Sequence, residues 1–131
     1  ILVEQKRKLI EKTTIEIPSG SGNIDEKPEE SAQREFWEET GIEITDTARF
    51  KKSYDLILCP NRFIKTVSVF HVFLTDSDIK LINNKADHEI EKVHYESFER
   101  VKEMVFSNEI QVGQSKEIIL NFLLRIGEKN R

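Results

Sequence analysis

Cysteine, proline and long apolar runs are scarce in this sequence of 131 residues. The single cysteine, Cys59, has no partner for an internal disulfide and no second thiol with which to build a zinc site. No stretch approaches the roughly 18 consecutive apolar residues that a membrane-spanning helix needs, and no basic-then-apolar leader is visible. With three prolines and five glycines, the chain is neither collagen-like nor of low complexity. We therefore expect a cytoplasmic protein with no membrane partner.

The composition is that of a folded domain of common size. Hydrophobic residues make up 37% of the chain and charged residues 34%, which is polar but sufficient for a core. We expect residues 1–131 to form a single domain. Because the chain begins at Ile1 rather than Met, we also expect that a native N-terminal segment is missing.

Negative charge is concentrated in one short segment. The formal net charge is -4, yet residues 20–42 alone hold seven acids against two bases, and the rest of the chain is nearly neutral. Two interpretations remain open, a solvated acidic helix face and a site for divalent cations. The mildly acidic balance and the absence of a basic stripe predict that the protein does not bind nucleic acid.

The hydrophobic pattern predicts strands alternating with three helices. Pro28 suits the first turn of a helix over residues 28–40 that stops at Gly41, Ser97 suits an N-cap, and a last helix should follow Gly113. Strands are predicted by alternating or continuous apolar residues over 1–5, 13–17, 42–54, 63–74 and 90–95. Together these elements indicate an α/β or α+β layered domain.

Three carboxylates recur at helical spacing in the first helix. Glu35, Glu38 and Glu39 stand at i, i+3 and i+4, so at about 3.6 residues per turn they share one face. Like charges placed this way repel, and helix stability alone does not favour them. Hard divalent cations such as Mg²⁺ or Mn²⁺ prefer oxygen ligands and convert that repulsion into attraction. Arg34 can pair with Glu38 or reach back to Glu26.

This helix lies within a longer pattern that resembles the signature of the Nudix hydrolases. The pattern is Gly20, five residues, Glu26, seven residues, then Arg34-Glu35-Phe36-x-Glu38-Glu39-x-Gly41-Ile42. Every position of the signature is filled. Phe36 is a mild variation, because that position is more often aliphatic.

The resemblance implies a fold and a chemistry. It implies an α/β/α sandwich with a mixed β-sheet, in which the signature forms a loop-helix-loop, and hydrolysis of a nucleoside diphosphate linked to another moiety. By the family's pattern Glu35, Glu38 and Glu39 hold Mg²⁺, with Mn²⁺ as a substitute. Arg34 orients them, Glu38 and Arg34 belong to the catalytic group, and Glu26 supports the helix or a ligand water. Such metals neutralise the diphosphate and activate a water.

A narrower resemblance points to the ADP-ribose pyrophosphatase branch. Residues 4–7 read Glu-Gln-Lys-Arg, and Glu16-Ile-Pro-Ser-Gly20 follows at similar spacing. In that branch the arginine matching Arg7 contacts the substrate's diphosphate, Glu16 lies at the same cleft, and the backbone carbonyl of Ser19 completes a metal site. The alternative is that Arg7 is a basic residue that simply faces solvent. Branch relatives also carry an N-terminal segment with adenine contacts and a homodimer interface. This segment is absent from the sequence, so we expect either that the sequence begins within a longer chain or that the protein lacks the module and handles its substrate differently. A homodimer is a further expectation from the resemblance.

Two loops complete the candidate site. Cys59-Pro60-Asn61-Arg62 resembles a proline-containing loop of the branch, although Asn61 stands where a glycine is usual; Arg62 either grips a phosphate or is an ordinary loop charge. Residues 83–89 are polar and precede a strand, a suitable place for a catalytic acid. Glu89 is the first candidate for the general base, Asp87 the second and Glu91 the third, while all three could be ordinary surface acids.

The leading hypothesis is a Mg²⁺-dependent pyrophosphatase acting on ADP-ribose or a related nucleotide sugar. Its products would be a nucleoside monophosphate and a sugar phosphate. Another enzyme hypothesis is a family member that hydrolyses nucleoside triphosphates or dinucleoside polyphosphates. A hypothesis from a different class is a catalytically silent module that binds nucleotides or proteins on the same scaffold.

Overall fold

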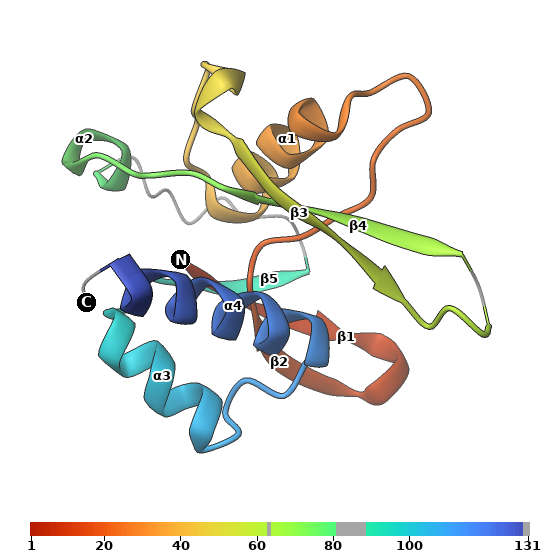
Figure 1. Ribbon diagram of the computed structural model, residues 1–131, viewed down its shortest axis with the longest axis vertical. Helices are drawn as coiled ribbons and strands as arrows, with labels where there is room; N and C mark the ends of the chain where they lie inside the picture. Colours follow the sequence, from red (N-terminus) through yellow and green to blue (C-terminus); the bar gives the residue numbers. More distant parts are fainter. Residues whose placement is uncertain (63, 81–88, 130–131) are drawn as a thin grey trace. The chain divides into compact units, whose positions relative to one another are not determined.

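The structure, a computed structural model, describes residues 1–62, 64–80 and 89–129 (Figure 1). The chain divides into two compact units, one made of Ile1–Pro18 with Ala86–Arg131 and the other of Ser19–Lys85. Each unit is described by itself below. Among the helices of the described ranges, none combines the length and the apolar character needed to cross a membrane.

The first unit is a three-stranded antiparallel sheet with two helices. Its strands are β1 (Leu2–Arg7), β2 (Lys12–Glu16) and β5 (Ile90–His94), in the order β2-β1-β5, with a 3-10 turn η1 (Lys8–Ile10) between β1 and β2. In the register, Val3 lies opposite both Glu16 and Val93. The helices are α3 (Phe98–Phe106) and α4 (Gly113–Lys129). Their apolar faces enclose a core with the sheet, formed by Leu2, Met104, Val105, Ile110 and Ile119.

The second unit carries the acidic helix. It consists of α1 (Pro28–Thr40), the 3-10 turn η2 (Thr47–Arg49), the antiparallel hairpin of β3 (Lys51–Leu58) and β4 (Lys65–His71), and the short α2 (Asp76–Ile79). The apolar side of α1 packs on the segment before the hairpin. Phe36 meets Phe50 edge to face, with ring centroids 5.9 Å apart, and Ile42 and Ile44 are buried.

The expected α/β class is confirmed, and so are the three main helices. The helix predicted over 28–40 has those bounds, and Ser97 caps α3 by accepting a hydrogen bond from the Arg100 amide at 3.2 Å. All pairings between described strands are antiparallel and fall in two sheets, so the mixed sheet implied by the resemblance is not among them.

The strand predicted over 42–54 is wrong in its first half. Residues 42–46 are extended without strand pairing, η2 follows, and β3 begins only at Lys51. Ile42 and Ile44 are buried while Glu43 between them is exposed, which produces the alternation of a strand. The chain then turns because the Asp46 carboxylate accepts from the Ala48 amide at 3.0 Å and starts η2. In this segment the alternation of apolar and polar residues reflects burial alone, because the segment pairs with none of the described strands.

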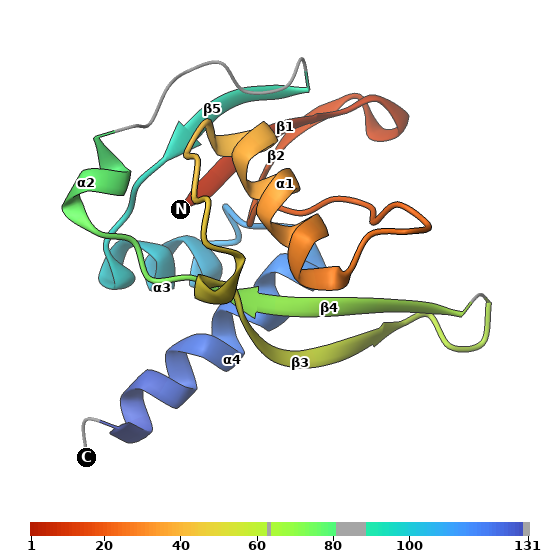
Figure 2. The ribbon, with the colours of Figure 1, turned by 90° about the horizontal axis from the view of Figure 1, so that it is seen from above.

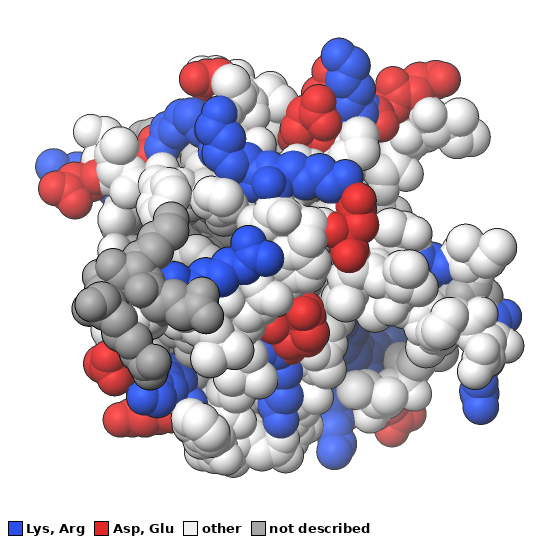
Figure 3. Space-filling model, viewed as in Figure 1, with Lys and Arg blue, Asp and Glu red and all other residues white. Residues whose placement is uncertain are grey.

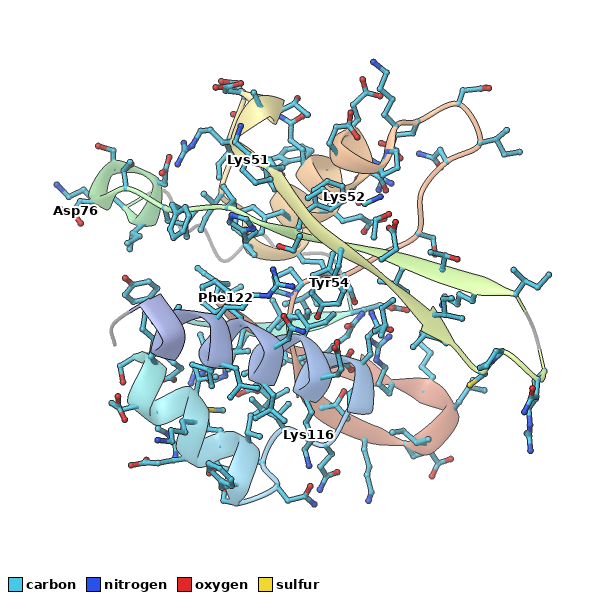
Figure 4. The ribbon with its side chains drawn as sticks, viewed as in Figure 1. Lys51, Lys52, Tyr54, Asp76, Lys116 and Phe122 are labelled. Carbon is cyan, nitrogen blue, oxygen red and sulfur yellow. The ribbon has the colours of Figure 1, made fainter. Side chains whose placement is uncertain are left out.

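Basic side chains gather where β3 begins. Lys51 and Lys52 lie there, both exposed (Figure 4). Two of the bases in this region are paired, since Lys52 contacts Asp55 at 2.8 Å and Arg49 contacts Asp78 at 2.7 Å. Over the face shown in Figure 3, acidic and basic groups are interspersed.

Candidate active site

The acidic helix α1 has a defined start and stop. Pro28 occupies the first turn, Glu29 and Glu30 place negative charge at the N-terminal end, and the Glu30 carboxylate accepts from the Lys27 amide at 3.0 Å. At the other end Gly41 adopts φ 73°, and its N–H donates to the Trp37 carbonyl at 2.8 Å. The signature's glycine therefore ends the helix in a left-handed conformation that suits glycine.

The side of α1 away from the glutamates is tied down by polar as well as apolar contacts. The Gln33 amide donates to the Ile44 carbonyl, and its oxygen accepts from the Thr47 hydroxyl at 2.7 Å. With Phe36 packed on Phe50, these bonds fix the rotation of the helix about its axis. Gln33 had no role in the sequence analysis, because its signature position accepts any residue.

Arg34 lies at the centre of the site and contacts three carboxylates. Its Nε and Nη2 both donate to Glu26, each at 2.9 Å, in a bidentate pair. Its Nη1 donates to Glu35 at 2.8 Å and to Glu38 at 3.1 Å. Both pairings expected of Arg34, to Glu38 and back to Glu26, are therefore present. Nη2 also donates to the Ser21 carbonyl at 3.0 Å, which draws the preceding loop onto the helix.

The network perturbs the ionisation of its members. The guanidinium of Arg34, together with the Asn23 amide, holds the pKa of Glu26 at about 2, below the ordinary value of 4.5. The hydrogen bonds that Arg34 donates to Glu26, and then its hydrogen bond to Glu35 and the charge of Glu35, raise the pKa of Arg34. Both groups are therefore ionised throughout the neutral range.

The carboxylate of Glu39 is held by the loop that precedes α1. It is only 5% exposed, and its Oε2 accepts from the Ser19 amide at 2.8 Å. The structure thus brings the backbone of Ser19, predicted to supply a metal-binding carbonyl, next to one of the predicted carboxylate ligands. A buried carboxylate with a directed backbone donor has few other orientations.

Gly20 explains why the signature begins with glycine. A Cβ atom at this position would lie 1.9 Å from the carboxyl carbon of Glu35, far inside van der Waals contact. The loop can pass this close to the carboxylate only because Gly20 has no side chain. No spacing in the sequence reveals this contact.

The donor set suits a hard divalent cation, although it is arranged around an arginine. Carboxylate oxygens of Glu35, Glu38 and Glu39, with the Ser19 carbonyl, are the ligand type that Mg²⁺ prefers. Arg34 uses one oxygen of Glu35 and one of Glu38. Within the described ranges, no three acidic, histidine or cysteine side chains are already gathered around one metal position. A cation held here would require these carboxylates to reorient.

Arg7 and Glu16, the predicted substrate-binding pair, form a separate cluster in the first unit. Arg7 lies on β1 and donates to both oxygens of Glu16 on β2, at 2.7 and 2.5 Å. Thr14 donates to the same carboxylate at 2.5 Å. Burial of Glu16, which is 2% exposed, opposes ionisation, but the bonds from Arg7 and Thr14 outweigh it and lower the pKa of Glu16. Arg7 is thus not simply a solvated charge.

Gln5 belongs to the same face of β1 as Arg7 and was missed by the sequence analysis. It is 6% exposed and lies opposite Thr14 in the sheet register. Among the described residues, its Oε1 is the buried side-chain oxygen without a hydrogen-bond partner. Buried polar atoms are normally satisfied, so a donor from outside the described chain is the expected partner. The period of two along a strand could have linked Gln5 to Arg7.

The remaining predicted residues lie in the first unit, at the end of the β3–β4 hairpin, or outside the described part of the chain. Glu89 directly precedes β5 in the first unit, is exposed, and has a carboxylate 3.8 Å from the Lys8 ammonium. Asp87 lies outside the described residues. Arg62 is exposed in the turn between β3 and β4, where its amide donates to the Cys59 carbonyl at 2.9 Å. Figures 1 and 2 show this end of the hairpin pointing away from α1, so the structure does not bring Arg62 to the glutamates.

Comparisons with known proteins agree with the pattern of the helix and its loop. The family model described as the NUDIX domain matches residues 1–116. The chain is also similar to a protein named ADP-ribose pyrophosphatase from Bacillus subtilis (strain 168), at 28% identity over 118 residues. That match covers 90% of this chain and 57% of the relative, so the chain spans little more than half the length of the curated protein.

Proposed function

Because the chain belongs to the NUDIX domain family, we propose that it hydrolyses the diphosphate linkage of a nucleoside diphosphate derivative. The most suitable substrate is ADP-ribose or a related nucleotide sugar, and the products are a nucleoside monophosphate and a sugar phosphate. The observation that carries this proposal is a row of three carboxylates on α1, which we call the ridge: Glu35, Glu38 and Glu39. Arg34, the Ser19 amide and the close approach of Gly20 hold these side chains in place.

Divalent cations complete the proposed site. Glu35, Glu38, Glu39 and the Ser19 carbonyl would hold Mg²⁺, which neutralises the diphosphate and lowers the pKa of a bound water. The chain's own contribution is orientation. Arg34 holds Glu35 and Glu38, and the Ser19 amide holds Glu39, so the carboxylates are kept together on one face of α1 before a cation arrives.

The substrate assignment rests on the first unit and on the relative's name. The proposed contacts are Arg7 to the diphosphate, with Glu16 holding the guanidinium through both of its donating nitrogens. A relative at 28% identity whose name states ADP-ribose as its substrate supports the choice. Arg62 remains a weaker candidate for a phosphate contact, because its turn points away from α1.

Glu89 is the proposed general base, and Asp87 is the second choice. Glu89 is a solvent-exposed carboxylate at the start of β5, so water can reach it. Its carbonyl accepts from the Lys6 amide at 2.9 Å, which fixes the backbone from which the side chain projects. In the proposed step the base takes a proton from the water that attacks phosphorus.

A substrate panel with product analysis tests the proposal. Purified protein is incubated with Mg²⁺ and ADP-ribose, other nucleotide sugars, nucleoside triphosphates or dinucleoside polyphosphates, and products are identified by chromatography and ³¹P NMR. We expect AMP and ribose phosphate from ADP-ribose. Preferred turnover of triphosphates or dinucleoside polyphosphates would favour the other enzyme hypothesis. Binding without turnover of any compound would favour a silent module and refute the enzyme proposal.

A further inference from the structure

The nitrogens of the Arg34 guanidinium fall into two groups with different hydrogen-bond partners. On one side, Nε and Nη2 make three hydrogen bonds, two to Glu26 and one to the Ser21 carbonyl, at 2.9 to 3.0 Å. On the other side, Nη1 alone bridges Glu35 at 2.8 Å and Glu38 at 3.1 Å. The stronger anchor is therefore on the Glu26 side.

Nη1 donates to two of the carboxylates, of Glu35 and Glu38, that would hold the cation. A hydrogen-bond donor and a metal ion compete for the carboxylate oxygens, and two positive groups close together repel. Only the two bonds of Nη1 have to break for the ridge to release its oxygens. The three bonds on the Glu26 side can persist and keep Arg34 near the helix.

We propose that Arg34 serves as a resident counter-cation, which stabilises the metal-free ridge through Nη1 and is displaced from it by the divalent ion. Glu26 sets the metal affinity by holding the rest of the guanidinium away from Glu35 and Glu38. The inference rests on the proposed function only in assuming that the ridge binds a divalent ion. It assigns Arg34 a role opposed to metal binding, beyond that of orienting ligands.

The direction in which Arg34→Gln changes the metal affinity distinguishes this role from simple orientation of the ligands. Arg34→Gln removes the competing charge, so the metal alone should bind more tightly, by roughly tenfold, which corresponds to the repulsion between a single and a double positive charge about 6 Å apart in water. If Arg34 only orients ligands, the same variant should bind metal more weakly. Turnover should fall in either case, and for that reason activity is not the readout.

The role of Glu26 is tested in two backgrounds. In the otherwise native chain, Glu26→Gln should weaken metal binding by roughly fivefold, because Arg34 then turns more fully to the ridge. Combined with Arg34→Gln, the same substitution should change the affinity by no more than about twofold, since its target is gone. Equal losses in both backgrounds would show that Glu26 acts on the metal directly and would overturn its proposed role.

The experiment measures binding of MnCl₂ to the full chain by electron paramagnetic resonance of free Mn²⁺, with MgCl₂ as competitor. Arg100→Gln is the matched control, because it makes the same change in an exposed pair with Glu109, outside the site. This control should bind as the native chain does. Circular dichroism spectra verify that each variant is folded, and Glu26→Gln provides an independent test if Arg34→Gln does not fold.

The outcomes distinguish the two proposals. Tighter binding by Arg34→Gln with an unchanged control supports the counter-cation. Weaker or unaltered binding by Arg34→Gln overturns it while leaving the proposed function intact. Absence of Mn²⁺ binding by the native chain would remove the metal site of the proposed function, and with it the basis of this inference.

Discussion

Two arginine–glutamate clusters, one in each unit, differ in how completely their charges balance. In the first unit Arg7 and Glu16 form a one-to-one pair, supported by Thr14. In the second unit Arg34 faces three carboxylates, of Glu26, Glu35 and Glu38. The charges of Arg7 and Glu16 cancel within the first cluster, whereas the second retains a surplus of negative charge. That surplus, rather than the presence of acids, is the reason why we propose the second cluster as the site for cations.

The largest expected effect comes from the acidic ridge. Glu39→Gln should reduce kcat/KM for the preferred substrate by at least about 100-fold, because a neutral amide is a poor ligand for Mg²⁺. The free energy of unfolding should change little, since the amide oxygen can still accept from the Ser19 amide and a repulsion is relieved. Steady-state kinetics and thermal melts measure the two effects. Full activity in this variant would contradict a metal role for Glu39.

A second prediction moves a ligand without changing its charge. Gly20→Ala places a Cβ atom within 1.9 Å of the Glu35 carboxyl carbon, so that carboxylate must shift. Because the atom displaced is the end of a flexible side chain, the melting temperature should stay close to native. The value of kcat/KM should fall by up to about 100-fold, the cost that a misplacement of about an ångström can have.

The matched control for this change lies two residues along the same loop. A Cβ atom at Gly22 would meet the Ser31 hydroxyl at an ordinary 3.4 Å, so Gly22→Ala should retain native kinetics. Equal losses in the two variants would indicate a general effect on the loop and would contradict the assignment to Glu35.

The balanced cluster should respond mainly in stability. Glu16→Gln leaves the guanidinium of Arg7 with a neutral partner in a partly buried position, and should lower the free energy of unfolding by about 1–2 kcal/mol. Glu91→Gln, in an exposed pair with Lys6 on the same sheet, should cost no more than about 0.5 kcal/mol. Urea unfolding provides both values. Similar small losses would mean that the buried pair contributes no more than an exposed one.

The smallest expected effect is a pH dependence of thermal stability that distinguishes the native chain from Glu26→Gln. The pKa of Glu26 is about 2 in the folded protein against an ordinary 4.5, so its contribution is complete above about pH 4.5 and declines as the pH falls toward 2. Melting temperatures of the native chain and Glu26→Gln should therefore differ most near neutrality and converge at low pH. A constant difference from pH 7 to pH 2.5 would contradict the lowered pKa.

The parts of the site that could be predicted from the sequence are those set by helical period. The bounds of α1, the shared face of Glu35, Glu38 and Glu39, and the reach of Arg34 to Glu38 follow from about 3.6 residues per turn. The contacts that could not be predicted join residues through space. Gln33 on the Ile44 carbonyl is a contact of this kind, formed by a side chain whose signature position carries no restriction.

The fold shows the same difference between features set by neighbouring residues and contacts made between distant residues. Local signals at Pro28 and Ser97 gave the starts of two helices, because caps are decided by neighbouring residues. The segment 42–46 alternates like a strand, yet only its burial alternates, since pairing depends on a neighbour that periodicity does not reveal. The pairing of Arg7 with Glu16 likewise depends on the β1–β2 register.

Diffraction from crystals of the full chain soaked in MnCl₂ with a non-hydrolysable analogue of ADP-ribose would locate the cation by its anomalous signal. The charge surplus around Arg34 predicts a peak coordinated by Glu35 and Glu39, with Arg34 Nη1 withdrawn from Glu35 and the bidentate contact to Glu26 retained. A peak elsewhere, or none at this ridge while the analogue is bound, would contradict the assignment of α1 as the catalytic metal site.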